Sequence, residues 1–144
     1  EPHTIYEYPS SKYVADFIGD INLFECLVTE DADNASSLYS AEIDATLEPP
    51  MGLSAPANQV LWYAIRPEKM RLSREPVSAS NVLSGVVHEI AYLGDFSVYW
   101  IDLDTGFRVR VSRPNISRMD HFAESWDERV YITWDPEAGV VLTQ

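Results

Sequence analysis

The chain has 144 residues, of which 46% are hydrophobic and 23% are charged, values typical of a folded globular domain. Asp and Glu number 23 against 10 Lys and Arg, so the net charge is −13. We therefore expect no nucleic-acid partner and no binding to an anionic membrane surface, because both would be repelled. The single cysteine, Cys26, excludes an internal disulfide and a multi-cysteine zinc site.

The first predicted element is a short helix over residues 10–18. Pro9-Ser10-Ser11 forms a helix start signal, because a hydroxyl can cap the free N–H groups of a first turn. Gly19 follows the segment, in a position where a left-handed terminating residue is common. The apolar residues between them lie on one stripe, which consists of Tyr13, Val14, Phe17 and Ile18. A helix this short is not stable alone, so the stripe must pack against another part of the protein.

After Asp20 the pattern predicts β-strands, short stretches rich in Val, Ile, Tyr, Trp and Leu between turn-forming residues. The predicted strands are residues 21–30, 38–47, 59–66, 85–93, 96–103, 106–112, 129–134 and 139–143. Short strands with regular turn signals are typical of a β-barrel or sandwich rather than a parallel sheet. The core is expected from the apolar alternation in residues 60–65, 86–93, 98–103 and 130–134.

Turns and an internal similarity complete the predicted organisation. Asp104-Thr105-Gly106 predicts a tight hairpin turn, residues 48–58 and 73–81 predict loops, and residues 119–123 predict one helical turn. Residues 61–72 (LWYAIRPEKMRL) also resemble residues 130–142 (VYITWDPEAGVVL), with Pro-Glu closing a strand in both. Two explanations remain open, namely two small barrel-like halves or two unrelated strands that both end in a proline turn.

No motif indicates catalysis. The glycines, at positions 19, 52, 85, 94, 106 and 139, form neither a phosphate loop nor a dinucleotide fingerprint. The three histidines lack metal-ligand spacing, and no nucleophile elbow is present. We expect this chain to be no enzyme and to hold no cofactor or metal.

Two sets of side chains are candidates for ligand contact. Arg108 and Arg110 share one face of a predicted strand and belong to a basic cluster with Arg113 and Arg118. The cluster is compatible with an anion site or with the polar face of a half-exposed strand. The tryptophans, Trp62, Trp100, Trp126 and Trp134, either box a cation or pack in the core.

Several short motifs in the sequence resemble those of one known family. Residues 5–7 (IYE), Pro9, residues 14–19 (VADFIG) and Asn22 resemble the end of the ATPase domain in the ATP-binding subunits of ABC importers. In that family this run leads into a C-terminal accessory domain of OB-like strands, the TOBE domain. Residues 64–68 (AIRPE) are similar to its Arg-Pro-Glu signature, and residues 85–87 and 90–95 (IAYLGD) to its second segment. The Ala-Tyr-Leu-Gly-Asp motif resembles that of the family members that import polyamines.

The resemblance implies a domain division. Residues 1–20 would be the tail of the ATPase domain with a connecting helix, and residues 21–144 a mainly β, OB-like barrel of TOBE type with short antiparallel strands. The signature residues implied to have structural or interface roles are Phe17, Ile18, Gly19, Arg66, Pro67, Glu68, Tyr92, Leu93 and Gly94. We expect Arg66 to pair with a carboxylate. The ATP-hydrolysing motifs of the family would precede residue 1, so no catalytic residue is carried over.

The resemblance also implies a role. The parent subunit would use ATP and Mg, pair as a homodimer and drive polyamines, putrescine above all, through membrane permease subunits. The accessory domain would lie on the cytoplasmic side, peripheral to the inner membrane, and act in assembly or regulation. Related domains in oxyanion importers bind their own substrate, which suggests a polyamine-sensing role here.

Charge asymmetry points to the place for such a ligand. Residues 1–65 hold 11 acidic residues and one base, Lys12, so their net charge is −10. A negative field attracts a dication. The acidic residues expected to face a polyamine are Glu25, Glu30, Asp31 and Asp33.

One position departs from the family, which usually has Gly where this chain has Cys26. A cysteine there would be strained if the backbone required positive φ. The alternative function is a stand-alone cytosolic β-barrel that binds a small ligand or an oxyanion.

Overall fold

The computed structural model describes residues 20–30, 35–115 and 127–143, and these residues form almost only β-structure. The strands are β1 (Asn22–Glu30), β2 (Ser36–Ser40), β3 (Ala45–Leu47), β4 (Val60–Ile65), β5 (Arg71–Ser73), β6 (Asn81–Tyr92), β7 (Phe96–Leu103), β8 (Arg108–Pro114), β9 (Arg129–Trp134) and β10 (Val140–Leu142). Two 3-10 turns, η1 (Pro67–Lys69) and η3 (Pro136–Ala138), connect strands. The helix predicted over residues 10–18 and the helical turn at 119–123 lie outside the described residues.

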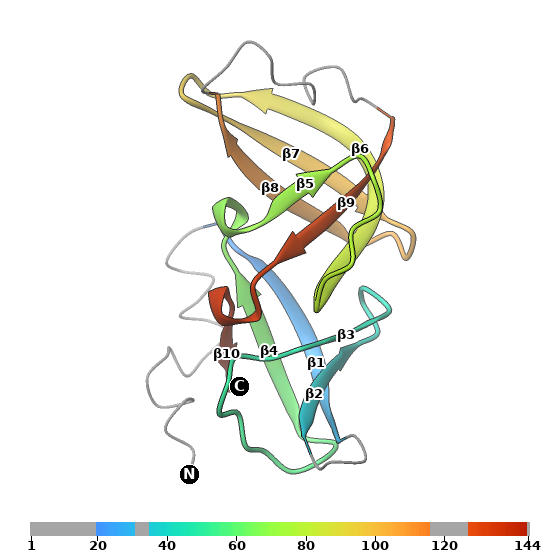
Figure 1. The fold of residues 1–144 in the computed structure, drawn as a ribbon, viewed down its shortest axis with the longest axis vertical. Coiled ribbons are helices and arrows are strands. Elements are labelled where there is room, and N and C mark those ends of the chain that lie inside the picture. Colours follow the sequence, from blue (N-terminus) through green and yellow to red (C-terminus); the bar gives the residue numbers. More distant parts are fainter. Residues whose placement is uncertain (1–19, 31–34, 116–126, 144) are drawn as a thin grey trace.

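The strands form two antiparallel sheets that follow one another along the long axis (Figure 1). Sheet A has the order β10-β4-β1-β2-β3, and sheet B has the order β5-β9-β6-β7-β8. Within the described residues each sheet is open at its two edge strands, so the single closed barrel of the prediction is replaced by two five-stranded sheets. The mainly β, antiparallel class is confirmed.

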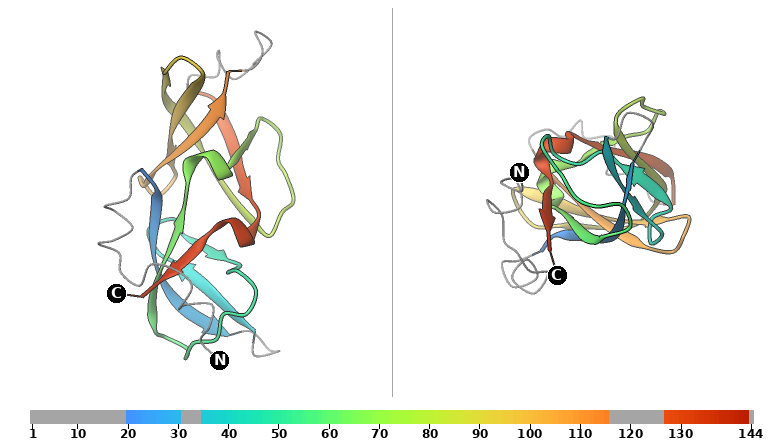
Figure 2. Two further views of the ribbon diagram at one scale, coloured as in Figure 1. Left: turned by 90° about the vertical axis from the view of Figure 1, so that its left-hand side faces the viewer. Right: turned by 90° about the horizontal axis from the view of Figure 1, so that it is seen from below.

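The two sheets share one topology. If β1 to β5 are matched with β6 to β10 in chain order, the order of sheet A becomes that of sheet B, except that the fifth strand of each half is exchanged. The chain crosses from sheet A to sheet B through η1 and returns through η3, as the left view of Figure 2 shows. The similar segments 61–72 and 130–142 contain these two crossovers, which occupy equivalent places in two halves of one topology. The similarity therefore reflects two related halves, each built around an open sheet.

Proline explains why both crossovers turn alike. Pro67 and Pro136 each begin a 3-10 turn, where the fixed φ of proline is already suitable and its missing N–H costs nothing. Asp135 caps the second turn by accepting a hydrogen bond from the Glu137 N–H at 2.9 Å.

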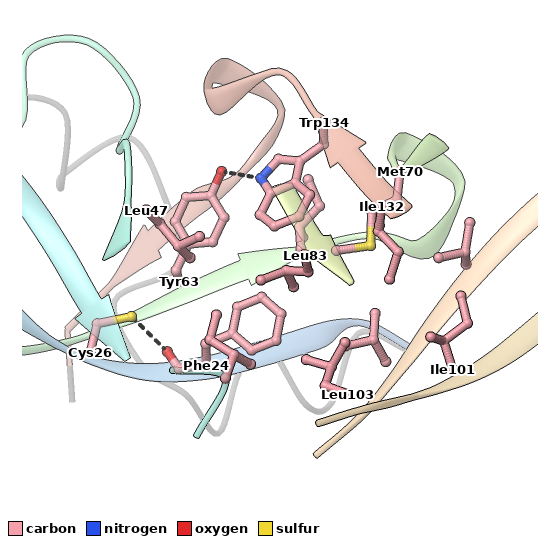
Figure 3. Packing of buried hydrophobic residues seen from close by; sticks show 14 of the residues in the cluster. Phe24, Cys26, Leu47, Tyr63, Met70, Leu83, Ile101, Leu103, Ile132 and Trp134 are labelled. Carbon is pink, nitrogen blue, oxygen red and sulfur yellow. Dashed lines mark hydrogen bonds between the residues drawn. The ribbon is translucent and has the colours of Figure 1, made fainter. Parts of the chain in front are cut away.

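A single hydrophobic cluster runs through both halves (Figure 3). It includes Leu61, Tyr63 and Ile65 of β4 and Val130, Ile132 and Trp134 of β9, in agreement with the predicted alternation. The Trp134 indole N–H donates to the Tyr63 hydroxyl at 3.0 Å, so the two crossover strands are joined inside the core. Strands β1, β2 and β8 also contribute to the cluster, a contribution that the predicted core omitted.

Two asparagines tie the halves together in the same way. Asn22, the first residue of β1, accepts a hydrogen bond from the Arg110 backbone N–H and donates to its C=O, both at 2.8 Å. Asn81, the first residue of β6, accepts from the Glu48 N–H at 2.7 Å and donates to its C=O at 3.0 Å. Each side-chain amide thus makes the two hydrogen bonds that a neighbouring strand would otherwise make, and it links its own half to the backbone of the opposite half.

Three predicted boundaries were wrong. Residues 38–47 are two strands with a turn at 41–44, because Asp44 adopts a left-handed φ of 50° that ends the extended run. Residues 71–73 form β5, a strand that was not predicted, and β6 begins at Asn81, inside the predicted loop. The hairpin turn at residues 104–106 is confirmed, with Gly106 at a φ of 96°.

Cys26 is accommodated without strain. It is not among the described residues with positive φ, and it points into the core with 1% of its surface exposed. A glycine is therefore not required by the backbone at this position.

Candidate functional site

The outward side of sheet A carries the most apolar face in the described part of the chain. In one cross-strand row, Val140, Ala64 and Leu23 are neighbours, and in the next row Leu142, Trp62 and Glu25 are neighbours. These residues point away from the main core because their strand neighbours, such as Tyr63 and Val141, point into it. A separate hydrophobic cluster forms on this face from Ile21, Leu23, Trp62, Ala64, Val140 and Leu142. We call these six residues the outer cluster.

A groove of about 270 Å³ continues this face toward β2. It is lined by Leu27, Tyr39, Val60 and Ala41, by residue Cys26 of β1, whose thiol points into the core, and by two carboxylates, Glu25 and Glu42, which we call its rim. Leu27 and Val60 are paired across β1 and β4, and each exposes 43% of its surface. The groove is therefore apolar along its length and negatively charged at its rim.

Local contacts hold the rim in place. The Glu25 backbone N–H donates to Glu42 Oε1 at 2.9 Å, which brings the 41–44 turn over the start of the groove. The Tyr39 hydroxyl donates to Asp44 Oδ1 at 3.0 Å, and this hydrogen bond to the carboxylate raises the pKa of Tyr39. Burial raises the pKa of the Cys26 thiol to about 12, with smaller contributions from the charges of Glu42 and Glu25, so the thiol is protonated at neutral pH. Because this thiol points into the core, the charge of the groove comes from Glu25 and Glu42.

This combination of groups suits an organic cation with an aliphatic body. Carboxylates at a rim attract ammonium groups, while the apolar walls remove methylene groups from water at about 0.8 kcal/mol each. A bare metal ion suits it less, because in the described residues no three His, Cys, Asp or Glu side chains are grouped closely enough to hold one.

The predicted acidic residues are only partly brought together. Glu25 lies at the groove. Glu30 lies at the far end of β1, five residues away, which is roughly 17 Å along an extended strand. Asp31 and Asp33 lie outside the described residues. Glu42 and Asp44, which accompany Glu25, were missed because residues 38–47 were predicted to be one strand, and a turn there is what places their side chains beside β1.

The signature residues lie in two separate places. Arg66, Pro67 and Glu68 form the entry to η1, where Pro67 is buried and Arg66 is exposed. No ion pair joins Arg66 to a carboxylate of the described residues, and its pairing with a carboxylate stays a prediction. Residues 92–94 form the tip of the β6–β7 hairpin at the other end of sheet B. Phe17, Ile18 and Gly19 lie outside the described residues.

The hairpin tip is exposed and rigidly built. Tyr92 and Leu93 expose 56% and 52% of their surfaces, and Gly94 supplies the turn with a φ of 84°. The Asn115 side-chain amide donates to the Gly94 C=O at 3.0 Å, and the Asn115 N–H donates to the Asp95 C=O at 2.7 Å. The tip therefore displays two large apolar side chains on a braced turn.

The basic cluster is neutralised within the chain. Arg108 forms an ion pair with Asp102 at 2.7 Å, and Arg110 forms one with Asp20 at 3.2 Å. The interpretation as a polar strand face is favoured over an anion site. Arg118 lies outside the described residues.

The described tryptophans do not form a cation box. Trp134 lies in the core between the halves, whereas Trp62 lies on the outward side of sheet A. Trp100 lies on β7 of sheet B, opposite Arg110 of β8. Trp126 lies outside the described residues.

A larger hollow of about 570 Å³ lies beside β2 and β3. Hydroxyl groups of Ser36, Ser37, Thr46 and Ser80 line it, and Glu48 is the only charged residue on its walls. It offers no cation for an anionic ligand and no second carboxylate for a diamine.

Known proteins resemble this chain at the level of sequence and of structure. A sequence model described as "TOBE domain" matches residues 63–142. The putrescine transport ATP-binding protein PotG of Escherichia coli is 35% identical over 144 residues, which cover 99% of this chain and 38% of PotG. The spermidine/putrescine import ATP-binding protein PotA of Treponema pallidum is 31% identical, covering 98% of this chain and 40% of PotA. The chain thus spans about two fifths of these relatives.

A solved structure shares the fold. A crystal structure of the cytoplasmic molybdate-binding protein ModG with molybdate bound superposes with a TM-score of 0.70, covering 85% of this chain and 96% of ModG. The sequence identity is 14%, so the likeness concerns the fold alone. Within residues 20–30, 35–115 and 127–143, no helix is long and apolar enough to cross a membrane.

Proposed function

This chain belongs to the TOBE domain family, and on that basis we propose that it is the C-terminal accessory domain of the ATP-binding subunit of an ABC transporter that imports polyamines, putrescine above all. The observation that carries the proposal is the similarity to PotG, which extends over 99% of this chain. In this proposal residues 1–20 are the tail of the ATPase domain and its connecting helix, and residues 21–144 are the accessory domain.

The role of the domain in the transporter is assembly or regulation. The parent subunit binds ATP and Mg through residues that precede this chain, pairs as a homodimer and lies against the permease subunits on the cytoplasmic side of the inner membrane. Two described features support a contact role, namely the exposed side chains of Tyr92 and Leu93 on the braced hairpin tip and the apolar outward side of sheet A. The exposed Arg66 and Glu68 at η1 offer a further polar contact.

Regulation by the transported substrate is supported by the groove beside β1. A diamine such as putrescine carries two ammonium groups joined by methylene groups, which match the carboxylates of Glu25 and Glu42 and the walls formed by Leu27 and Val60. Glu30, with Asp31 and Asp33, adds to the negative field of this half from the far end of β1.

A calorimetric titration with putrescine at low and at moderate salt tests the sensing role. Saturable binding that survives moderate salt and is lost in Glu25→Gln with Glu42→Gln is the expected result, because a formed groove is screened less than a diffuse field. Glu75→Gln, in the exposed loop before β6, is the matched control and should bind as the unchanged chain does. Weak heat that salt removes, or equal binding in both variants, would leave assembly as the role of the domain.

Deleting residues 21–144 from the parent subunit tests the accessory role itself. We expect reduced ATP-dependent putrescine uptake together with weaker pairing of the subunit. Uptake and pairing that are both unchanged would contradict the proposal.

The alternative of an oxyanion-binding domain has less support from the residues. Arg108 and Arg110 of the predicted basic cluster are held by Asp102 and Asp20, and the hollow beside β2 and β3 has Glu48 as the one charged residue on its walls. A titration with molybdate or sulfate distinguishes the two functions, and we expect no saturable heat.

A further inference from the structure

The turn that carries Glu42 at the groove is held by the opposite half of the molecule. Residues 41–44 connect β2 to β3 of sheet A, and they lie against the hairpin turn at residues 104–106 between β7 and β8 of sheet B (Figure 1). The Thr105 hydroxyl donates to the Glu42 C=O at 2.6 Å, although the two residues are 63 positions apart in the chain. One rim residue of the groove therefore has its backbone fixed by a side chain of sheet B.

The Thr105 hydroxyl is oriented by its own hairpin. Its oxygen accepts a hydrogen bond from the Phe107 N–H at 3.3 Å. A hydroxyl has a single proton to donate, and this proton is directed to the Glu42 C=O. A valine has the same branched shape at Cβ but makes neither hydrogen bond, so a change at residue 105 separates the effect of the hydroxyl from that of packing.

The same hairpin also reaches β1 next to the groove. The ring of Phe107 packs against the ring of Phe24 with the centroids 5.5 Å apart, and Phe24 directly precedes Glu25 on β1. Both rim residues, Glu25 and Glu42, therefore lie within one residue of a contact with this hairpin of sheet B.

Glu42 bonds to β1 at the point where the pairing of β1 with β2 ends. The last pair is Leu27 with Tyr39, two residues from Glu25. The Glu25 N–H donates to Glu42 Oε1 at 2.9 Å, so a carboxylate oxygen is the acceptor beyond the end of the ladder. A carboxylate has two oxygens, and this arrangement leaves the second one for an ammonium group at the groove.

We propose that Thr105 is a positioning residue for Glu42 and that it thereby sets the selectivity of the groove for diamines over monoamines. The proposal rests on the proposed sensing function, because it assigns one of the two ammonium groups of the ligand to Glu42. A diamine needs both carboxylates in fixed places, whereas a monoamine needs only one, which Glu25 provides. Releasing the 41–44 turn therefore weakens the binding of a diamine and leaves that of a monoamine largely unchanged.

A comparison of two ligands of equal carbon number tests the selectivity in the full chain. Calorimetric titrations with butylamine and with putrescine give the ratio of the two dissociation constants. Thr105→Val should reduce this ratio about three- to tenfold, the factor that one net hydrogen bond represents. Thr105→Ser, which keeps the hydroxyl, should retain the ratio.

The matched control is Thr133→Val on β9, at a partly exposed residue that does not line the groove, and it should also retain the ratio. An unchanged ratio in Thr105→Val would overturn the proposal, as would an equal loss of affinity for both ligands. A serine variant that behaves like the valine variant would overturn it as well, because the hydroxyl would then not be the cause.

A second measurement needs no ligand and keeps the two proposals apart. The amide proton of Glu25 resonates downfield while it donates to a carboxylate, and Glu42→Gln gives its position without that charge. In Thr105→Val the resonance should move most of the way to this position, and in Thr105→Ser it should stay. A resonance that stays in Thr105→Val contradicts the positioning role, whether or not putrescine binds. An unchanged chain that shows no saturable putrescine binding would reject the sensing function and the selectivity, and the Glu25 resonance would then decide the positioning role alone.

Discussion

The outward faces of the two sheets differ although the two halves share one topology. On sheet B the outward side carries ion pairs, with Arg108 paired to Asp102 and Arg129 paired to Asp104 at 3.1 Å. On sheet A the corresponding side carries the outer cluster and the groove. The two halves therefore share a topology while their outward faces differ in chemistry, and the search for a small ligand begins at the groove of sheet A.

In the interior the two halves are alike, because residues at equivalent positions make equivalent contacts between the halves. Asn22 and Asn81 begin equivalent strands and hold backbone of the opposite half through paired hydrogen bonds. Tyr63 and Trp134 meet between the two crossover strands. The two halves therefore have similar contacts where they meet, whereas their outward surfaces differ.

The largest loss of stability is expected when one of the two equivalent asparagines is removed. Asn22→Ala leaves the N–H and C=O of Arg110 without these partners, and Asn81→Ala does the same to Glu48. Each variant should lower the free energy of unfolding by about 2–4 kcal/mol, since each unsatisfied buried group costs about 1–3 kcal/mol. Urea denaturation measures both.

A conservative change separates the two hydrogen bonds. Asn22→Asp keeps the acceptor for the Arg110 N–H and removes the donor to its C=O, so its loss should be intermediate. If the losses in Asn22→Ala and Asn81→Ala differ severalfold, the two asparagines are not equivalent.

The next largest loss of stability is expected when a residue of one half is placed at the equivalent position of the other half. Gly85 is the fifth residue from Asn81, as Cys26 is from Asn22. A Cβ at Gly85 would lie 2.5 Å from the Asp102 backbone oxygen and 2.8 Å from Ile101 Cγ2. Gly85→Cys should therefore cost about 1–3 kcal/mol in urea denaturation. Ser84→Cys, whose side chain is partly exposed, is the control and should cost less than about 0.5 kcal/mol.

The contrast between the outward faces is tested by two tryptophans. Trp62 packs in the outer cluster and Trp100 lies on the outward side of sheet B; both are half-buried. Trp62→Ser should lower the free energy of unfolding by about 2 kcal/mol, because it removes apolar area from the outer cluster. Trp100→Ser should cost less than about 1 kcal/mol. Equal losses in thermal or urea denaturation would mean that the faces differ in composition but not in burial.

Much of the fold followed from side-chain alternation. The strand over residues 129–134 was predicted at its true bounds, because Val130, Ile132 and Trp134 alternate with more polar neighbours and a proline ends the run. The prediction of one strand over residues 38–47 was wrong because the composition of residues 41–44 gives no signal for the left-handed conformation of Asp44. Three-residue strands such as β5 carry too few positions to show alternation, and their pairing is decided by distant strands.

The candidate site was less predictable than the fold. Charge alone selected Glu25, which lies at the groove, together with Glu30, which does not, because sequence proximity does not distinguish the two ends of a strand. Glu42 joins Glu25 only through a turn that follows another strand. The outer cluster combines residues from β1, β4 and β10, and its last members are about 120 positions from its first. No local pattern announces such a face.

Cys26 gives the two halves different responses to alkaline pH. Burial raises the pKa of this thiol from 9.0 to about 12, and its counterpart Gly85 has no titratable group. Above pH 9 the unfolded thiol loses its proton while the folded one keeps it, so stability is lost as pH rises, by up to about 1.4 kcal/mol per pH unit. Burial raises the pKa of Tyr63 as well, which adds to the loss above pH 10. Urea denaturation at pH 8 and pH 10 should show a smaller decrease in the free energy of unfolding for Cys26→Ala than for the unchanged chain; an equal decrease would show that Cys26 is not its source.

The smallest effect is expected on the outward side of sheet B, and its size tests whether that face is open to water. The hydrogen bond from Arg108 lowers the pKa of Asp102, with additional contributions from the charges of Arg108 and His88. The pair therefore contributes stability above the ordinary pKa of Asp102, and this contribution is lost as pH falls into the acidic range. Because both side chains are largely exposed, Asp102→Asn should cost less than about 1 kcal/mol at neutral pH, and the cost should decrease with added salt. Urea denaturation at low and high salt measures it. A larger cost that salt does not reduce would mean that this face is not open to water, and the contrast between the two sheets would then fail.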